Sequence, residues 1–407
     1  MLSGSRLASG FGRLAWSNLA AQSAEQIALA AAPIVAVLAL GAGAGATGLL
    51  QTAQTLPFLI LSVPAGVLAD RVSRRRLMAG AEALRALALA AVLALAHAEL
   101  LTLPLLALFG FVGACGTVAY SVTAPALVPA LVPADTLAEA NGRIELARTV
   151  AFAGGPALAG ALVGWMGGAP AFGVAAALST WAVVLLAGLR EPPRQPVASR
   201  RVLRDLRDGV VFVFRHPLLR PVFLTQLVFN TAFFVLQAVY VPYAVHRLGL
   251  SALGVGATLA TYGVGMVLGA LLAPRIMRVL PFGLVIVLGP IAGVAAAVVM
   301  VLTIWLPAGW LAALSFFLIG TGPIVWVIST ATLRQTVTPP ELLGRASAIS
   351  MTATGARPIG AALGAFLGAV YGAETCLIVA ALGFVLQAML IVMSPVLTLE
   401  RQPQMVG

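Results

Sequence analysis

The chain contains no lysine, and charged residues of any kind make up only 9% of its 407 residues. Soluble domains carry about 25% charged residues, so this composition excludes an ordinary soluble domain. The net charge of +11 comes from arginines that lie between apolar runs rather than on one polar face, which argues against nucleic-acid binding. With 61% hydrophobic residues and a mean hydropathy of +1.04, the composition indicates a protein embedded in a lipid bilayer.

Residues that carry redox, metal or nucleophilic chemistry are scarce. Cys115 and Cys376 both fall inside apolar runs, so we expect small buried side chains rather than a disulfide or a metal pair. The three histidines, His97, His216 and His246, lie far apart, and the sequence holds no phosphate-binding loop and no nucleophile elbow. We therefore expect no enzymatic activity, no bound metal and no cofactor.

Clusters of glycine, proline and arginine divide the chain into twelve apolar segments. Each is close to the roughly 20 residues that a membrane-spanning helix needs. The first segment exceeds the apolar core of a signal peptide and contains Glu25, so we expect it to be retained. The predicted spans are 16–40, 48–69, 77–97, 103–126, 141–164, 169–189, 219–243, 252–273, 282–304, 309–331, 346–370 and 373–395.

The arginines are distributed unevenly between the loops on the two sides of these spans. Helices that alternate across a membrane leave arginine mainly on the cytoplasmic side. If the N-terminus is inside, the external loops hold essentially only Arg247. We therefore predict a multi-pass protein with both termini in the cytoplasm. On this topology the cytoplasmic arginines are Arg6, Arg13, Arg71, Arg74, Arg75, Arg76, those from Arg190 to Arg220, Arg275, Arg278 and Arg401.

One long polar connection separates six spans from six. We predict an N-terminal half at 1–190, a cytoplasmic linker at 191–218 and a C-terminal half at 219–407. Within the linker, apolar residues recur at helical spacing, which favours an amphipathic helix on the inner membrane surface. A solvated basic linker is the alternative. The apolar residues with this spacing are Leu203, Leu206, Val210 and Val213.

The two halves carry traces of an internal repeat. The residues Leu68, Ala69, Arg71 and Arg74 recur 204 positions later as Leu272, Ala273, Arg275 and Arg278. A second set in the fifth span recurs in the eleventh at nearly the same offset. An even number of spans in each half predicts a parallel repeat, related by an axis along the membrane normal.

The thirteen residues from Gly66 to Met78, GVLADRVSRRRLM, place one acid and four arginines in a turn between two apolar segments. This stretch resembles the signature loop between helices 2 and 3 of the major facilitator superfamily, with Ser73 where the signature usually has glycine. The pair Gly344-Arg345, which opens helix 11, resembles the corresponding position in the second half. The resemblance covers the whole chain and implies an all-α integral membrane fold with twelve transmembrane helices in two pseudo-symmetric six-helix halves.

Helix 5 is similar to the antiporter signature of drug exporters in that superfamily. Gly142, Gly155, Pro156 and Gly160 stand at signature positions, and alanine replaces glycine twice elsewhere in the pattern. The helix 4 arginine of many proton-coupled exporters is absent from 105–126. The stretches LVPADTLAEANGRIELARTVAF and FRHPLLRPVF are most similar to the group that contains the enterobactin exporter and macrolide-efflux-type proteins.

We interpret the charged loop as a conformational latch. Asp70 can lie at the N-terminus of helix 11, where backbone amides lack partners and the helix dipole is positive. Such contacts form only when the cytoplasmic ends of the halves are together, so they would favour an outward-open state. The alternative is an anchor that touches lipid phosphates. The latch residues are Gly66, Asp70, Arg71, Arg74, Arg75, Gly344 and Arg345.

Small residues in helix 5 predict close packing against a neighbouring helix, and Pro156 predicts a bend. A gating role for Gly142, Gly155, Pro156 and Gly160 and close packing without gating both fit this pattern.

Few charges lie far from the predicted helix ends, and such charges are functional candidates because burying them in lipid is costly. Glu25 lies well inside helix 1, and Arg357 lies midway along helix 11. Glu25 is a candidate for proton coupling or contact with a cationic substrate, and a static pair with Arg357 is the alternative. Glu82 with Arg85, and Glu145 with Arg148, have the spacing of structural pairs on one helix face.

The resemblance implies that the substrate path lies between the halves and is faced mainly by helices 1, 4, 7 and 10. An aromatic wall with few fixed charges suits large amphipathic or weakly cationic compounds. Aromatic residues in membrane helices also face lipid or the protein core, and both interpretations stay open. The candidate substrate residues are Gln22, Gln26, Tyr120, Gln226, Asn230, Phe233, Gln237, Tyr262 and Trp326.

We therefore predict a monomeric secondary transporter of a bacterial cytoplasmic membrane, with a small-molecule substrate and protons as its partners. The expected activity is proton-coupled export of amphipathic, drug-like or siderophore-like molecules by alternating access. Uptake of a nutrient by the same fold is one alternative. A membrane sensor or scaffold without transport is another.

Overall fold

The computed structural model describes residues 9–133, 136–191 and 202–403. Within these ranges the structure is built from helices, and no strand is present. The helices are α1 (Ser9–Leu38), α2 (Ala44–Ile60), α3 (Ser62–Arg71), α4 (Arg74–His97), α5 (Leu103–Leu131), α6 (Leu137–Met166), α7 (Gly168–Ala187), α8 (Val202–Arg215), α9 (Leu219–His246), α10 (Ala252–Val279), α11 (Phe282–Leu302), α12 (Gly309–Val337), α13 (Pro340–Thr352), α14 (Ala356–Val370) and α15 (Ala373–Val392).

Among the described residues, ten helices are long and apolar enough to cross a bilayer. An eleventh such segment is formed by α2 and α3 together, which meet at an angle of 47°. The span expected at 346–370 is divided between α13 and α14 by a 3₁₀ turn at Ala353–Gly355. The twelve predicted segments are therefore all helical, and the all-α membrane fold is confirmed.

Proline accounts for the places where two spans are broken. Pro57 lies inside α2, Pro64 lies in the first turn of α3, and Pro358 lies in the first turn of α14. A proline lacks the amide hydrogen that a helix interior requires, and its ring crowds the preceding turn.

Large apolar side chains such as Leu87 and Leu382 remain exposed on the spanning helices, as expected for surfaces in contact with lipid.

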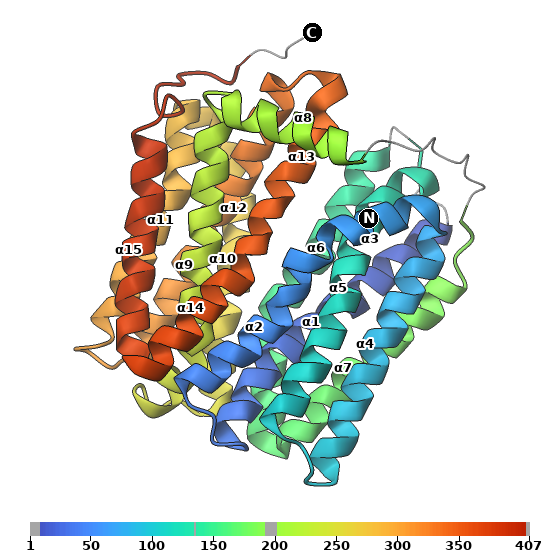
Figure 1. Cartoon of the computed structure of the whole chain (residues 1–407), viewed down its shortest axis with the longest axis vertical. Coiled ribbons are helices and arrows are strands. Elements are labelled where there is room, and N and C mark those ends of the chain that lie inside the picture. Colours follow the sequence, from blue (N-terminus) through green and yellow to red (C-terminus); the bar gives the residue numbers. More distant parts are fainter. Residues whose placement is uncertain (1–8, 134–135, 192–201, 404–407) are drawn as a thin grey trace, which may run out of the picture. The chain divides into compact units, whose positions relative to one another are not determined.

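The chain divides into two compact units, which we describe separately. Unit 1 consists of Met1–Ala42, Ala53–Ala198 and Ser251–Ala260. In this unit α1 packs against α6 and α7, while α4 packs against α5 and α7 (Figure 1).

Unit 2 consists of Gly43–Thr52, Ser199–Leu250 and Thr261–Gly407. In this unit α9 packs against α14 and α15, and α11 packs against α12 and α15. The start of α2 belongs to unit 2 and the start of α10 belongs to unit 1, so two short segments depart from a simple division at the linker.

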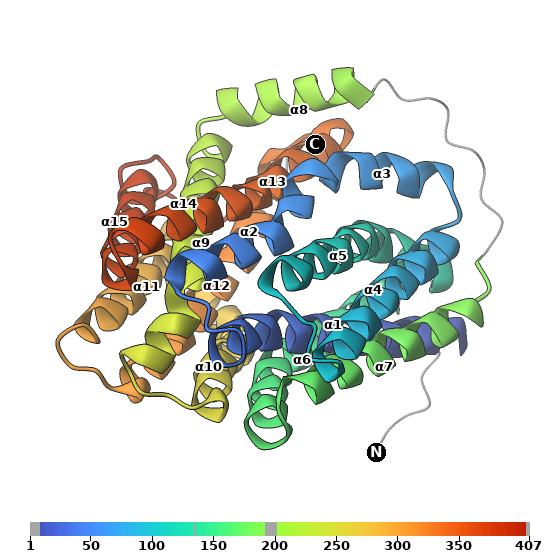
Figure 2. The same cartoon turned by 60° about the horizontal axis from the view of Figure 1, so that its bottom comes forward.

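The linker carries the helix α8, which lies beside α13 in unit 2 (Figure 2). Val213 is 2% exposed in the core cluster that also contains Ile349 of α13. Val210 and Phe214 remain exposed on the same helix. The predicted amphipathic helix is thus present, although part of its apolar side contacts protein. The side chains of Leu203 and Leu206 lie outside the described part.

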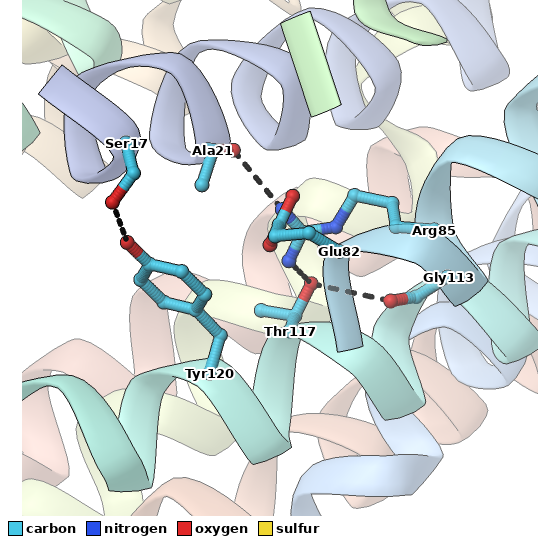
Figure 3. A network of polar contacts seen from close by, with 7 residues as sticks. All are labelled: Ser17, Ala21, Glu82, Arg85, Gly113, Thr117 and Tyr120. Carbon is cyan, nitrogen blue, oxygen red and sulfur yellow. Dashed lines mark hydrogen bonds and ion pairs between the residues drawn. The ribbon is translucent and has the colours of Figure 1, made fainter. Parts of the chain in front are cut away.

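A buried ion pair lies inside unit 1 (Figure 3). Glu82 and Arg85 on α4 are 0% and 3% exposed, and Glu82 Oε1 is 2.8 Å from Arg85 Nη1. Arg85 also donates hydrogen bonds to the carbonyl oxygen of Ala21 on α1, at 3.1 Å, and to Thr117 Oγ1 on α5, at 2.7 Å. One guanidinium group therefore joins three helices.

A second polar contact also joins α1 to α5. Ser17 Oγ on α1 and Tyr120 Oη on α5 share a hydrogen bond of 3.4 Å, and both residues are buried (Figure 3). The predicted pairing of Glu82 with Arg85 is confirmed, and so is that of Glu145 with Arg148 on α6. The two pairs differ in burial, because the second is partly exposed.

We expect the substitution Arg85→Met to lower the free energy of unfolding by about 3–5 kcal/mol, because it leaves the Glu82 carboxylate buried without its counter-ion. Removing both charges with Glu82→Leu and Arg85→Met together should restore most of that loss. The matched control is Arg148→Met in the exposed pair, with an expected loss of at most about 1 kcal/mol. Thermal unfolding in detergent measures all three. Equal losses of unfolding free energy in Arg85→Met and Arg148→Met would show that the buried pair contributes no more to stability than the exposed pair.

Candidate functional site

The charged loop joins the end of α3 to the start of α4. Helix α3 ends at Arg71, and Ser73 is the N-cap of α4. The Ser73 hydroxyl oxygen accepts a hydrogen bond from the backbone amide of Arg76, at 3.3 Å. Serine fits this position because its side chain satisfies an amide that the first turn of the helix leaves unpaired.

Glu191, just after α7, binds this loop. Its carboxylate accepts hydrogen bonds from the backbone amides of Arg74, at 3.1 Å, and Arg75, at 3.2 Å, and from the Ser73 hydroxyl. In return, Arg75 donates to the carbonyl oxygens of Ala187, at 3.1 Å, and Leu189, at 3.3 Å. A carboxylate thus lies at the N-terminus of α4 and a guanidinium at the C-terminus of α7, where each complements the helix dipole.

These hydrogen bonds shift the titration of Glu191. Partial burial raises the pKa of its carboxyl group, but hydrogen bonds from Ser73, Arg75 and Arg74, with the charge of Arg74, outweigh burial and hold the pKa below its ordinary value. Glu191 therefore stabilises the folded loop at neutral pH, and this contribution is lost as the pH falls through the lowered pKa. The sequence alone did not identify Glu191 as a functional candidate. Its position directly after the sixth predicted span was the only feature that could have indicated its contact with the loop.

The remaining latch residues are distributed over both units. The side chain of Asp70 lies outside the described part, Arg71 is exposed, and Gly66 has ordinary room for a side chain. Arg345 on α13 donates a hydrogen bond to Asp208 on α8, at 3.1 Å. A Cβ at the neighbouring residue Gly344 would have no other atom within 4 Å. The latch stays a prediction, and the structure adds that the linker helix contacts Arg345.

The helix 5 glycines lie on α6, and two of them face close neighbours within unit 1. A Cβ at Gly155 would lie 2.4 Å from the Gln26 Cβ on α1, which leaves no room for a side chain. A Cβ at Gly160 would lie 2.8 Å from the Gly256 Cα on α10. Pro156 contributes a carbonyl oxygen to that same contact with Gly256. Gly142 meets no atom within 4 Å, so it takes no part in these crossings.

Unit 2 contains a comparable crossing that the sequence analysis missed. A Cβ at Gly48 on α2 would lie 2.4 Å from the Ala365 Cα on α14, and one at Gly45 would lie 2.6 Å from the Ala369 Cβ. The spacing of Ala365 and Ala369, four residues apart, is the small-residue pattern of packed membrane helices. That pattern was available in the sequence but was not distinguished from the many other small residues.

The two mid-span charges lie in different units. Glu25 is partly buried on α1 in unit 1. Arg357 is partly buried at the start of α14 in unit 2, and its Nε donates a hydrogen bond to Asn230 Oδ1 on α9, at 3.3 Å. The guanidinium carbon of Arg357 lies 5.5 Å from the ring centre of Phe234, also on α9, in a cation–π contact.

Five of the nine candidate substrate residues are buried inside their units. Tyr120 is 2% exposed, Gln26 packs against Gly155, and Trp326 packs against Gly289 on α11. Asn230 and Phe233 are buried on α9. The other four candidates are partly exposed: Gln22, Gln226, Gln237 and Tyr262.

Aromatic rings gather on α9 of unit 2. Phe229 and Phe233 stack with ring centres 5.7 Å apart, and Phe233 and Tyr262 on α10 stack at 5.9 Å. Phe234 meets Phe233 edge to face.

Within the described ranges, no group of three or more His, Cys, Asp or Glu side chains is arranged to hold a metal ion. Cys376 is buried and Cys115 is partly exposed, and both are free thiols.

We expect Glu191→Gln to speed hydrogen exchange at the amides of Arg74 and Arg75 by about tenfold at neutral pH, because charge-assisted hydrogen bonds are lost. The ratio of variant to wild-type exchange should approach one as the pH falls through the lowered pKa of Glu191. Glu139→Gln, which alters the exposed pair with Arg143 on α6, is the control and should leave these amides unchanged. Equal exchange in wild type and Glu191→Gln at neutral pH would contradict the assignment.

Two adjacent glycines on α6 provide a matched test of close packing. Gly155→Leu should lower the free energy of unfolding by about 1–3 kcal/mol or more, because its side chain collides with Gln26. Gly154→Leu should change it by no more than about 0.5 kcal/mol, because nothing lies within 4 Å of its Cβ. Thermal unfolding of the purified variants measures both, and equal effects would show that α6 has room to move away from α1.

Comparison with known proteins places this arrangement in a family. The family model described as transmembrane secretion effector matches residues 10–405. The chain is 29% identical over 327 residues to the uncharacterized MFS-type transporter y4rN of Sinorhizobium fredii, with 78% of each chain covered. It is 28% identical over 344 residues to the enterobactin exporter EntS of Citrobacter koseri, covering 81% of this chain and 78% of EntS.

A third relative is the multidrug efflux pump Tap of Mycolicibacterium fortuitum, which is 28% identical over 229 residues, or 54% of this chain and 56% of Tap. Among solved structures, a POT family transporter in complex with 5-aminolevulinic acid matches with a TM-score of 0.75 at 14% identity, over 96% of each chain. The nucleoside transporter NupG matches with a TM-score of 0.72 at 14% identity, over 95% of this chain and 99% of NupG.

The two solved structures share the fold alone at this level of identity, whereas the family match extends over nearly the whole chain. The helical spans, the charged loop after α3 and the glycine crossings of α6 all belong to that matched region. The protein is therefore a multi-pass membrane transporter and not an enzyme, and it belongs to the transmembrane secretion effector family of the major facilitator superfamily.

Proposed function

We propose that the protein is a secondary active exporter of amphipathic, drug-like or siderophore-like small molecules, coupled to the entry of protons. Two relatives support export, since one is described as a multidrug efflux pump and another as an enterobactin exporter. The protein would act as a monomer in a bacterial cytoplasmic membrane with both termini inside.

The close helix crossings carry the proposal of alternating access. Gly160 on α6 meets Gly256 on α10, and Gly48 on α2 meets Ala365 on α14. Each crossing joins a helix from the first half of the sequence to a helix from the second. Helices that touch through small residues have few interlocking side chains, so such contacts can separate and re-form while each helix stays intact.

On the predicted topology, both crossings are external and the charged loop after α3 is cytoplasmic. A transporter that alternates needs contacts on each side that break in turn. The crossings would close the external side, and Asp70 with the neighbouring arginines would close the cytoplasmic side. Glu191 supports this role because it holds the loop and the start of α4 in one conformation.

Glu25 is the proposed proton carrier. It lies well inside α1, away from both helix ends, and its side chain is partly buried. A carboxyl group in such a place can take up and release a proton close to the proposed substrate path. Protonation also removes the free-energy cost of burying a charged carboxylate. Arg357 is the proposed counter-charge in the other half of the chain.

Inverted membrane vesicles test direction and coupling together, because their lumen corresponds to the outside of the cell. A panel of fluorescent amphipathic compounds should accumulate when the lumen is acidic and lose that accumulation when the gradient is collapsed. Glu25→Gln should reduce accumulation under the gradient to the collapsed level. Glu99→Gln, in an exposed loop, is the control and should accumulate normally. Gradient-driven accumulation that persists in Glu25→Gln would remove Glu25 from the coupling mechanism.

A further inference from the structure

The C-terminal end of α12, which is cytoplasmic on the predicted topology, carries two buried polar atoms without a partner. Arg334 lies in the last turn of α12, and Thr338 is the C-cap residue of that helix. The Arg334 Nε and the Thr338 Oγ1 are both enclosed by the protein, and neither has a hydrogen-bond partner among the described residues. Buried polar atoms are nearly always hydrogen-bonded, so two such atoms at one helix end require an explanation.

The backbone explains why the Thr338 hydroxyl makes no hydrogen bond within the helix. Threonines in the interior of α12 donate to a carbonyl oxygen of the preceding turn, as Thr336 does to Leu333, at 2.9 Å. Thr338 has φ −110° and ψ 124°, so the chain has left the helix at this residue. Its side chain is 2% exposed, so bulk water does not replace the missing partner. The hydroxyl can therefore donate to a further group.

Arg334 and Thr338 lie beside the core of unit 2. Leu333 and Val337, the residues directly before them, belong to a buried cluster that α12 shares with α8, α9, α11 and α13. Residues four apart lie on the same side of a helix, so we expect the side chains of Arg334 and Thr338 to adjoin each other. The helix end thus combines a fixed cation with a hydroxyl group.

No ion pair joins Arg334 to an acid among the described side chains. A partly buried arginine without a counter-ion is costly, because it stays charged at every physiological pH. The side chains of Asp205 on α8 and Glu341 on α13 lie outside the described part. The described acids of unit 2 are Asp208, which binds Arg345, Glu374, which lies 3.2 Å from Arg247, and Glu400, which is exposed.

The donors at this place favour an acceptor with several oxygens and a negative charge. A guanidinium offers parallel N–H groups, including Nε–H, that match two oxygens of a carboxylate or a phosphate. The threonine hydroxyl adds a third donor. A phosphate group can accept all three hydrogen bonds on separate oxygens, whereas a carboxylate has only two oxygens. On the predicted topology this helix end also lies at the inner membrane surface, where the phosphates of phospholipids are found.

We infer that Arg334 and Thr338 form a binding site, the Arg334 site, for a phosphate group. Arg334 binds two phosphate oxygens through Nε–H and a neighbouring N–H, and the Thr338 hydroxyl donates to a third. The phosphate belongs either to a phospholipid headgroup or to a soluble phosphate compound. The site uses no residue of the proposed proton or substrate path, so it goes beyond the proposed function. A ligand that binds only the folded protein also stabilises it.

Binding to the purified, delipidated protein in detergent tests the site. The lipid probe is dioctanoyl phosphatidylglycerol, and its matched control is dioctanoylglycerol, which lacks the phosphate. Inorganic phosphate is the soluble probe, with chloride at the same ionic strength as its control. We expect phosphatidylglycerol to bind saturably in titration calorimetry and to raise the unfolding temperature, whereas dioctanoylglycerol should do neither. Saturable binding of inorganic phosphate as well would show that the phosphate group suffices, and its absence would identify the phospholipid as the source.

Point variants separate the two donors. Arg334→Gln should weaken binding about tenfold or more, because charge-assisted hydrogen bonds are lost. Thr338→Val keeps the shape of the side chain but loses the hydroxyl, so binding should weaken about fivefold. Thr338→Ser keeps the hydroxyl and should retain the affinity. Arg220→Gln, which alters an exposed arginine in the first turn of α9, is the control and should bind as the wild type does.

The stability of the ligand-free protein gives an independent test. Arg334→Met keeps the aliphatic stem and removes a charge without a counter-ion, so its unfolding temperature should equal or exceed that of the wild type. A lower unfolding temperature would show that Arg334 already has a counter-ion within the protein, and would overturn the inference. Undiminished binding in Arg334→Gln would also overturn it. So would binding that is absent from the wild type and appears only in Glu341→Gln, since Glu341 would then be the partner.

Discussion

The architecture depends on one constraint, which is that a bilayer offers no water to satisfy backbone hydrogen bonds and no hydrophobic force to drive helices together. The first condition makes helices the form of the described spans. The second leaves close van der Waals contact as the main source of helix association, and small residues allow the closest approach. The contacts of Gly155 with Gln26 and of Gly160 with Gly256 follow from this requirement.

The same medium governs where charges are placed. Arg85 is enclosed by α1, α4 and α5, and its contacts with Glu82, Thr117 and Ala21 make it part of the framework of unit 1. Arg357 is only partly buried, and its described contacts on α9 are a neutral amide and an aromatic ring. A charge enclosed by three helices stabilises one arrangement of those helices.

The loop after α3 and the linker show how helix ends are joined within each unit. Glu191 and Arg75 satisfy the backbone groups that α4 and α7 leave unpaired, so the charged loop is tied to the end of the sixth span. In unit 2, Asp208 ties the linker helix α8 to Arg345 on α13. Glu191 and Asp208 therefore contact the elements to which the proposed latch residues belong.

The sequence by itself determined the twelve helical segments, the superfamily and the pairing of Glu82 with Arg85. The segments and the pair depend on apolar length and on spacing within one helix, and both can be read along the chain. The superfamily was indicated by the resemblance of the loop at Gly66–Met78 and of helix 5 to known signatures. The sequence did not reveal Glu191, the Gly48 crossing or the pairing of Arg345 with Asp208, and it could not show that Tyr120 is enclosed in a packed core. Each of these joins helices far apart in sequence. Only the tertiary structure decides which faces meet, because small and apolar residues occur on nearly every face of a membrane helix and therefore do not specify their partners.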